Sequence, residues 1–169
     1  MRIHAEEIEA TGGAKLAASL GALSADHLEH IDDAGISAMA RAGTVAVLLP
    51  GTAVTLRMSP PPTKRLREAG VDIAVGTDLN PGTSYLEDLP LAATLACGLF
   101  HLTFEDALLG ITKHAAKAVG LAGRVGELSA GAAADLLAYE LPSEEHLLYR
   151  FGQPSPRCVM KSGRVVIST

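Results

Sequence analysis

The feature that most constrains the fold is a recurring landmark, a residue that closes a short, strand-like run and opens a loop. His4, His27, Pro50 and Asp78 take this place at intervals of 23 to 28 residues. An interval of this length holds one strand, one loop and one helix, and that order repeated is typical of right-handed βα units on a parallel sheet. The sequence therefore predicts an α/β fold.

Helices are predicted between and after these runs, and a different pattern follows them. The expected helices run from the Gly12-Gly13 break to Leu20, from Asp32 to Ala42, from Pro60 to Ala69, from Leu86 to Gly98 and from Thr103 to Gly120. Pro50-Gly51 is expected only to end the third strand. Beyond Gly126 we expect a turn, a strand at 134–139 and two short antiparallel strands around a Ser162-Gly163 turn. The predicted units are βα repeats over residues 1–122 and a β tail over 123–169.

Composition excludes several classes of protein. The 169 residues are 48% hydrophobic and 20% charged, so there is enough apolar surface for a folded core. The net charge of −5, the 4% of aromatic residues and the lack of a long Lys/Arg run argue against nucleic-acid binding. Cys97 and Cys158 are far apart, and neither a signal peptide nor an apolar run of bilayer length is present. We therefore expect a cytoplasmic protein that does not bind membranes.

Three of the landmarks carry side chains that suit a catalytic divalent metal. His4, His27 and Asp78 each lie at the carboxyl end of a predicted strand, where the loops of parallel α/β folds converge. Imidazole and carboxylate groups are good ligands for Zn²⁺. Each residue alone has a plainer interpretation, since a lone histidine is usually an ordinary polar residue and Asp78 could cap the next helix. Their equivalent places in successive units favour a shared site.

Five segments resemble a known family. They are His4-Ala5-Glu6-Glu7, Ser24-Ala25-Asp26-His27-Leu28, Val47-Leu48-Leu49-Pro50-Gly51, Thr77-Asp78-Leu79-Asn80-Pro81-Gly82-Thr83-Ser84, and Gly126-Glu127-Leu128 with Ala134-Asp135-Leu136. Together they resemble the carboxyl-terminal half of the imidazolonepropionases, a family of the metal-dependent amidohydrolase superfamily. The resemblance covers nearly the whole chain. It implies the carboxyl-terminal half of a TIM-like (β/α)8 barrel, with strands that correspond to the fifth to eighth, and a small antiparallel tail from a composite β-sandwich domain.

The resemblance also implies roles for individual residues. His4 and Asp78 correspond to ligands of one divalent metal, Zn or Fe. Glu7 corresponds to a catalytic carboxylate that contacts the substrate ring, and His27 to a catalytic histidine that hydrogen-bonds the oxyanion or the nucleophile. Loop positions that hold substrate or product correspond to Asn80, Gly82 and Thr83. The implied reaction is hydrolysis of the cyclic amide 4-imidazolone-5-propanoate to N-formimidoyl-L-glutamate in histidine degradation, with Asp78 moving the proton of the attacking water.

The chain departs from this family in length and in its histidines. Family members are much longer, and their first barrel strand ends in a His-x-His pair that occurs nowhere in these 169 residues. We therefore expect a truncated portion that is inactive alone, needs a complementary amino-terminal half, and otherwise self-associates or forms homo-oligomers. Two other interpretations stay open: a non-catalytic half-barrel or interaction module, and another cyclic amidase or a deaminase of the superfamily. The Asn80–Thr83 loop argues against the last.

Glu6 and Glu7 are adjacent in the sequence and point in different directions. We expect that one of them serves the site while the other faces water.

Overall fold

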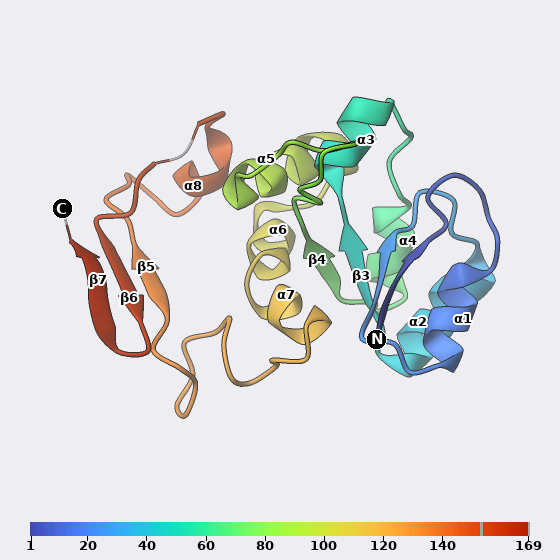
Figure 1. Ribbon diagram of the computed structural model, residues 1–169, viewed down its shortest axis with the longest axis horizontal. Coiled ribbons are helices and arrows are strands. Elements are labelled where there is room, and N and C mark those ends of the chain that lie inside the picture. Colours follow the sequence, from blue (N-terminus) through green and yellow to red (C-terminus); the bar gives the residue numbers. More distant parts are fainter. Residues whose placement is uncertain (153, 169) are drawn as a thin grey trace.

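The computed structural model describes residues 1–152 and 154–168, which form two β-sheets and the helices around them (Figure 1). The first sheet is parallel, with the order β1 (Arg2–Ala5), β2 (Ser24–His27), β3 (Val45–Leu48) and β4 (Ile73–Val75). The predicted βα repeat is therefore confirmed. Each strand lies beside its neighbour in sequence, so the loops at the four carboxyl ends share one edge of the sheet.

The two faces of this sheet differ because side chains alternate along each strand. Ala25 and Ala46 are aligned across β2 and β3, and both belong to the buried cluster that packs beneath the helices. The next row, on the opposite face, aligns His4 with Asp26 and Asp26 with Val47. The sequence thus places His4 and Asp26 on the face away from the main core, beside a second, small apolar cluster that includes Val47.

Eight helices are present in the described part of the chain. They are α1 (Gly13–Ser19), α2 (Asp33–Ala42), α3 (Pro50–Leu56), α4 (Thr63–Glu68), α5 (Leu89–Phe100), α6 (Phe104–Gly110), α7 (Lys113–Ala118) and α8 (His146–Tyr149). Asp32 caps α2 through a hydrogen bond from the Gly35 amide, and Thr103 caps α6 in a capping box with Asp106. None of these helices is long and apolar enough to cross a membrane.

The helices differ from the expected ones in three places. Pro50 does not merely end β3; it begins α3, because a proline at the first helical position gives up an amide that would have no partner there. The predicted helix 103–120 is divided into α6 and α7, since the Thr112 hydroxyl bonds the Leu108 carbonyl at 2.6 Å and its backbone leaves the helical conformation. The four-residue helix α8 is too short to show a periodic pattern.

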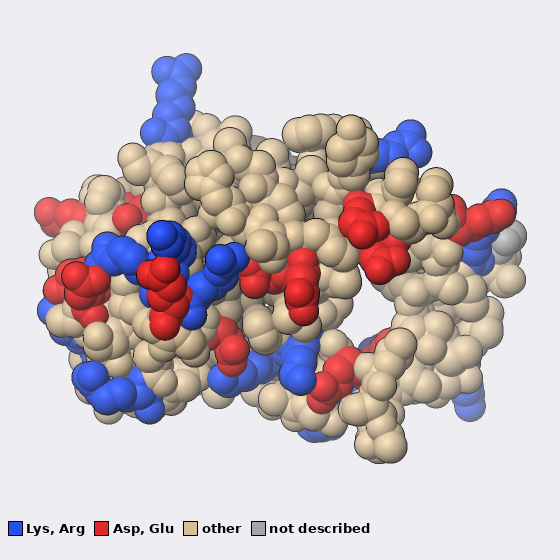
Figure 2. Space-filling model, turned by 180° about the vertical axis from the view of Figure 1, so that it is seen from behind, with Lys and Arg blue, Asp and Glu red and all other residues tan. Residues whose placement is uncertain are grey.

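The second sheet is the predicted antiparallel tail. It contains β5 (Leu136–Ala138), β6 (Cys158–Lys161) and β7 (Arg164–Ser168), and Ser162 and Gly163 form the turn with left-handed backbones. Buried Leu148 of α8 joins the main core, where α8 contacts α5. Seen from behind, an opening separates this sheet from the helical part (Figure 2). The division at residues 122 and 123 stays a prediction.

Candidate active site

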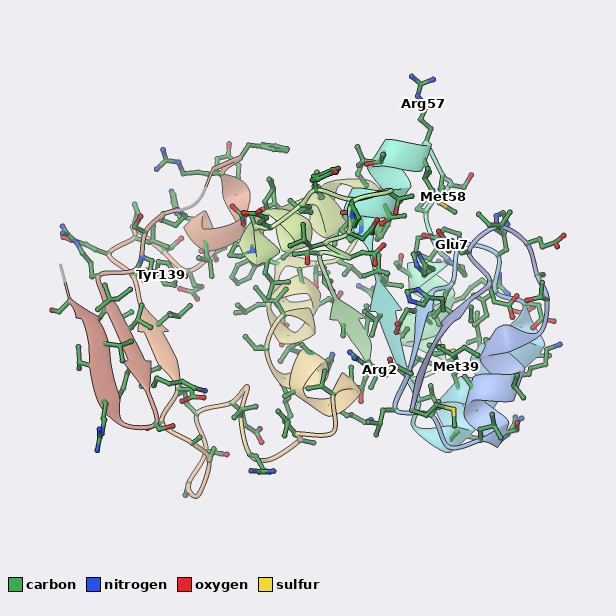
Figure 3. All side chains as sticks on the ribbon, viewed as in Figure 1. Arg2, Glu7, Met39, Arg57, Met58 and Tyr139 are labelled. Carbon is green, nitrogen blue, oxygen red and sulfur yellow. The ribbon has the colours of Figure 1, made fainter. Side chains whose placement is uncertain are left out.

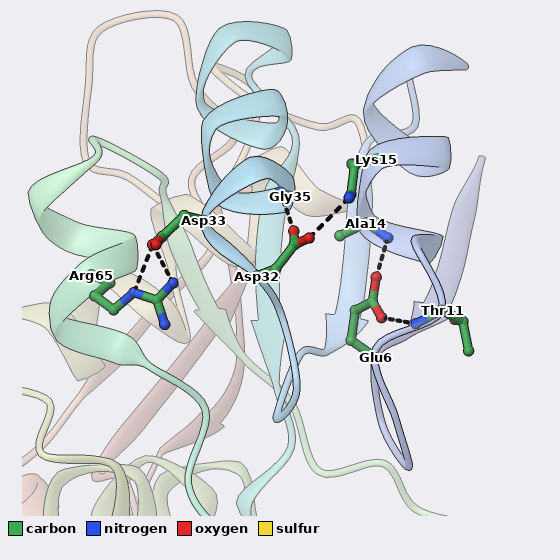
Figure 4. Close-up of polar contacts among 8 residues, drawn as sticks. All are labelled: Glu6, Thr11, Ala14, Lys15, Asp32, Asp33, Gly35 and Arg65. Atoms are coloured by element: carbon green, nitrogen blue, oxygen red, sulfur yellow. Dashed lines mark hydrogen bonds and ion pairs between the residues drawn. The ribbon is translucent and has the colours of Figure 1, made fainter.

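The loop after β1 contains two glutamates with different tasks. Glu6 has a left-handed backbone (φ 56°) and is 5% exposed. Its carboxylate accepts hydrogen bonds from the Thr11 amide at 2.6 Å and the Ala14 amide at 3.1 Å, at the start of α1 (Figure 4). The expectation that one glutamate of the pair faces water is therefore wrong: Glu6 is buried because it satisfies amides that the helix leaves unpaired. Glu7 is left free to face the strand ends.

Backbone hydrogen bonds tie the loop after β2 to the loop after β1. The Leu28 amide donates to the Ala5 carbonyl at 3.1 Å, and the His30 amide donates to the Glu6 carbonyl at 2.9 Å. Between them the chain reverses through two consecutive left-handed residues, His27 (φ 77°) and Leu28 (φ 73°). Such conformations are unfavourable for residues other than glycine and are held here by the surrounding contacts.

This reversal brings His27 against the side chains of the first loop. His27 Nε2 lies 3.0 Å from His4 Nδ1 and 3.7 Å from Glu7 Oε2. The two imidazole rings are tilted, with centroids 5.1 Å apart. Figure 3 shows Glu7 at this end of the sheet and Arg2 at the opposite end. Three residues singled out in the sequence, His4, Glu7 and His27, therefore meet.

His27 is the most buried member of this group, and its surroundings favour the neutral imidazole. Burial lowers the pKa of His27, while the negative charges of Glu7 and, more weakly, Asp78 oppose that shift. Its Nδ1 atom is buried and has no hydrogen-bond partner among the described residues. A neutral histidine can accept a proton near neutral pH, as a general base must.

The loop after β4 supplies Asp78, also in a left-handed conformation (φ 51°). The hydroxyl of buried Thr52, on α3, donates to Asp78 Oδ2 at 2.6 Å. The side-chain amide nitrogen of Asn80, Nδ2, donates to the Asp78 carbonyl at 2.6 Å. The Asp78 charge acts on the pKa of His27, so the β4 loop belongs to the same electrostatic environment as the β1 and β2 loops.

Asn80 organises the rest of this loop. Its Oδ1 accepts hydrogen bonds from the Gly82 amide at 2.9 Å and the Thr83 amide at 2.8 Å. Gly82 is exposed, and a Cβ added there would lie 3.3 Å from Asn80 Oδ1. The three expected substrate-binding residues therefore form one hydrogen-bonded turn, and their contact with a ligand stays a prediction.

The donors present agree in kind, but not in number, with a catalytic metal centre. His4 and Asp78 offer an imidazole and a carboxylate, the groups that hold Zn²⁺ or Fe²⁺. Within residues 1–152 and 154–168, no group of three His, Cys, Asp or Glu side chains is placed to hold a metal ion. These residues can therefore supply part of a ligand set.

The candidate site does not coincide with either of two cavities in the described part of the chain. A cavity of about 330 Å³ lies by Asp72, His114 and Lys117, ahead of β4, and one of about 280 Å³ lies by Met58 and Phe100. The site residues line neither. The strand-end loops define the candidate site, because catalytic groups in parallel α/β folds come from those loops.

Sequence reasoning missed two buried polar residues near the site. Thr52 follows Pro50-Gly51, a pair that predicts only the end of a strand. Glu29 is 8% exposed, and neither of its carboxylate oxygens has a hydrogen-bond partner in the described part of the chain. Burial raises the pKa of Glu29 to about 7, with a smaller contribution from the charge of Glu7. The only signal in the sequence that could have placed Glu29 near the site is its closeness to His27 in the chain.

Comparison with known proteins gives one matching family over nearly the whole chain. The amidohydrolase family matches residues 3–166. The imidazolonepropionase of Polaromonas sp. is 51% identical over 168 residues, which are 99% of this chain and 40% of that protein. The imidazolonepropionase of Rhizobium meliloti is 50% identical over 98% of this chain and 40% of its own length. The chain thus spans about 40% of the length of the curated relatives that it matches.

Solved structures agree on the fold. An adenosine deaminase from Xanthomonas campestris with bound zinc superimposes with a TM-score of 0.81 and 22% identity, over 99% of this chain and 45% of that one. A variant of an atrazine chlorohydrolase from Arthrobacter aurescens, complexed with zinc and atraton, gives a TM-score of 0.78 at 18% identity. The match covers 88% of this chain and 37% of that one. At these identities the likeness establishes the architecture and leaves the substrate open.

Proposed function

The chain belongs to the amidohydrolase family, and from this premise we propose that it is a portion of an imidazolonepropionase. The proposed reaction is hydrolysis of the cyclic amide bond of 4-imidazolone-5-propanoate, which gives N-formimidoyl-L-glutamate in histidine degradation. The substrate is a small molecule, and no nucleic acid or membrane takes part. The two cysteines of the described chain are free, which favours a reducing, cytoplasmic location.

One observation carries the proposal: His4, Glu7 and His27 meet where the parallel strands end, within reach of the charge of Asp78. These are the residues whose segments resemble the imidazolonepropionases. The sequence identity of about 50% to the imidazolonepropionases of Polaromonas and Rhizobium meliloti supports the same substrate for this chain. A deaminase of the family is the competing enzyme, and the likeness to solved deaminases supports it only at the level of the fold.

The proposed roles follow from the positions of the side chains. Asp78, held by Thr52, accepts a proton from the attacking water and passes it to the ring nitrogen as the amide bond breaks. Neutral His27 hydrogen-bonds the nucleophile or the developing oxyanion. Glu7, next to His27, binds the N–H edge of the imidazolone ring. The turn made by Asn80, Gly82 and Thr83 borders the substrate.

The proposed cofactor is one divalent ion, Zn or Fe, with His4 and Asp78 among its ligands. Such an ion, when bound, lowers the pKa of water and polarises the amide carbonyl. His4 engages His27 through Nδ1, which leaves Nε2 for the ion. Since the described residues contain no complete donor group, we propose that the further ligands come from the part of the relatives that this chain does not span.

The need for further metal ligands separates the proposal from a non-catalytic interpretation. In the alternative, the chain is a half-barrel that folds or binds a partner without turnover. The incomplete donor group favours that alternative for the chain alone. The buried, strained loops that converge on His27 favour the catalytic interpretation once the remaining portion is supplied.

The test is complementation in trans. The chain is mixed with the amino-terminal portion of the Polaromonas imidazolonepropionase and with Zn²⁺ or Fe²⁺, and the loss of imidazolone absorbance is followed. Adenosine, the substrate named for the similar deaminase, is offered in parallel. We expect hydrolysis of the imidazolone only by the mixture. A folded, metal-loaded complex that leaves the imidazolone intact would refute the proposal, and one that releases ammonia from a purine would favour a deaminase.

A further inference from the structure

The backbone of Asp78 needs external support. Its φ of 51° lies in the left-handed region, which L-residues rarely adopt. A residue in such a conformation persists only when neighbouring contacts hold it there. Within the loop, a bridge between Asn80 and Ser84 closes a turn, and the Asn80 side-chain amide donates to the Asp78 carbonyl at 2.6 Å. These local contacts hold the backbone and do not reach the Asp78 carboxylate.

Helix α3 provides a contact to the side chain of Asp78. Thr52 is completely buried, and its Oγ1 donates to Asp78 Oδ2 at 2.6 Å. Among the described residues no other hydrogen-bond donor reaches this carboxylate, so Asp78 Oδ1 is left without a protein partner and can bind another group. A hydrogen bond from one hydroxyl to one carboxylate oxygen fixes the rotation of the group as well as its place.

The residue before Thr52 lets α3 approach the loop. A Cβ added to Gly51 would lie 2.6 Å from Ser84 Oγ and 3.1 Å from Leu86 Cδ2, distances that would push the loop away. Ser84, in turn, donates to the Thr77 carbonyl at 2.7 Å and so holds the residue that precedes Asp78. Two adjacent residues at the start of α3 therefore lie against the loop, Thr52 at Asp78 and Gly51 at Ser84.

We propose that Thr52 is a positioning residue, whose hydroxyl holds the Asp78 carboxylate in the single orientation that the site requires. Gly51 makes that contact reachable. The importance of Asp78 for hydrolysis rests on the function proposed above, whereas the contact between the two residues does not. The proposal extends the site to α3, an element that supplies no metal ligand and no proposed substrate contact.

The test measures the side-chain rotation of Asp78 in the metal-free chain. Backbone-to-carboxyl scalar couplings from nuclear magnetic resonance report whether its χ1 angle takes one value or several. We expect one rotamer in the wild type and in Thr52→Ser, which keeps the hydroxyl, and averaged couplings in Thr52→Val, which is nearly isosteric but lacks it. Thr55→Val, which removes the hydroxyl that bonds the Gly51 carbonyl on the same helix, is the matched control and should leave Asp78 unchanged.

Several outcomes would overturn the proposal. They are averaged Asp78 couplings in the wild type, the single wild-type rotamer retained in Thr52→Val, or couplings in Thr52→Ser that are averaged as much as in Thr52→Val. Should Thr52→Val not fold, the wild-type and Thr52→Ser couplings still decide. In the complemented enzyme we expect Thr52→Val to lower kcat on the order of 10- to 100-fold with little change in KM, and Thr52→Ser to restore it. Absence of turnover in all variants, with the couplings as expected, counts against the proposed function and not against this contact.

Discussion

Glu29 shows how a single buried group can make the stability of this molecule depend on pH. Its carboxyl is 8% exposed and without a partner in the described chain, and its pKa is raised from 4.5 to about 7. Below the lower value the group is neutral in both the folded and the unfolded state. Between the two values only the unfolded state releases the proton, so the free energy of unfolding falls as the pH rises through this range.

We expect Glu29→Gln to remove this dependence. Relative to the wild type, the free energy of unfolding of the variant should increase by on the order of 3 kcal/mol between about pH 4.5 and about pH 7, and then level off. Urea unfolding across this range measures the difference. Glu9→Gln, at an exposed position of the β1 loop, is the control and should follow the wild type. Parallel curves for wild type and Glu29→Gln would show that Glu29 is not held neutral.

The loop after β1 contains a glutamate that holds the structure, Glu6, and one with a proposed role in the reaction, Glu7. Removing the carboxylate in Glu6→Ala leaves the Thr11 and Ala14 amides without their acceptor, so we expect unfolding free energy to fall by about 1–3 kcal/mol. Glu7→Ala should change stability by less than about 0.5 kcal/mol and reduce turnover in the complemented enzyme. Urea unfolding and the imidazolone assay measure the two effects. The reverse assignment, with Glu7→Ala the less stable variant, would contradict the geometry.

Among the elements of the fold, the strands could be predicted from the sequence and the loop conformations could not. The apolar run at Val45–Leu48 and the regular spacing of His4, His27 and Asp78 depend on local sequence, which is why the parallel sheet could be foreseen. The left-handed backbones at His27 and Asp78 depend on contacts from other loops, such as the bond from His30 to Glu6. Helix α3 was missed because Pro50-Gly51 ends one element and begins the next.

The family resemblance, by contrast, identified the residues that meet at the site but could not identify their supports. His4 and His27 come together as expected from their equivalent strand ends, and Glu7, which the resemblance added, lies beside His27. Thr52 and Glu29 act through burial and tertiary contacts, and no motif of spacing or composition marks them. On the face seen in Figure 2, Lys and Arg side chains lie among Asp and Glu side chains.

For the whole molecule, the open edges of the first sheet predict association. Strands β1 and β4 each have a partner on one side only, which exposes backbone groups able to pair with another chain. We expect light scattering after size exclusion to give masses above 17.4 kDa that increase with concentration. The complementary amino-terminal portion should convert these species to a one-to-one complex.

A variant in the tail tests which edge is responsible. Val166 on β7 is 59% exposed, and Val166→Lys places a charge on that edge while leaving the first sheet unchanged. Association that persists in this variant supports the edges of the first sheet. Association that disappears would assign it to the tail, and a wild-type chain that stays monomeric at every concentration would contradict the prediction altogether.

The central claim is that hydrolysis takes place at the carboxyl end of β4, through Asp78. The most direct measurement compares kcat for imidazolone hydrolysis in the complemented enzyme between Asp78→Asn and Asp72→Asn. Asp72 lies at the other end of the same strand, where it pairs with Lys117 and His114. The account predicts a loss of at least about 100-fold for Asp78→Asn and little change for Asp72→Asn. Retained turnover in Asp78→Asn, or an equal loss in both variants, would contradict it.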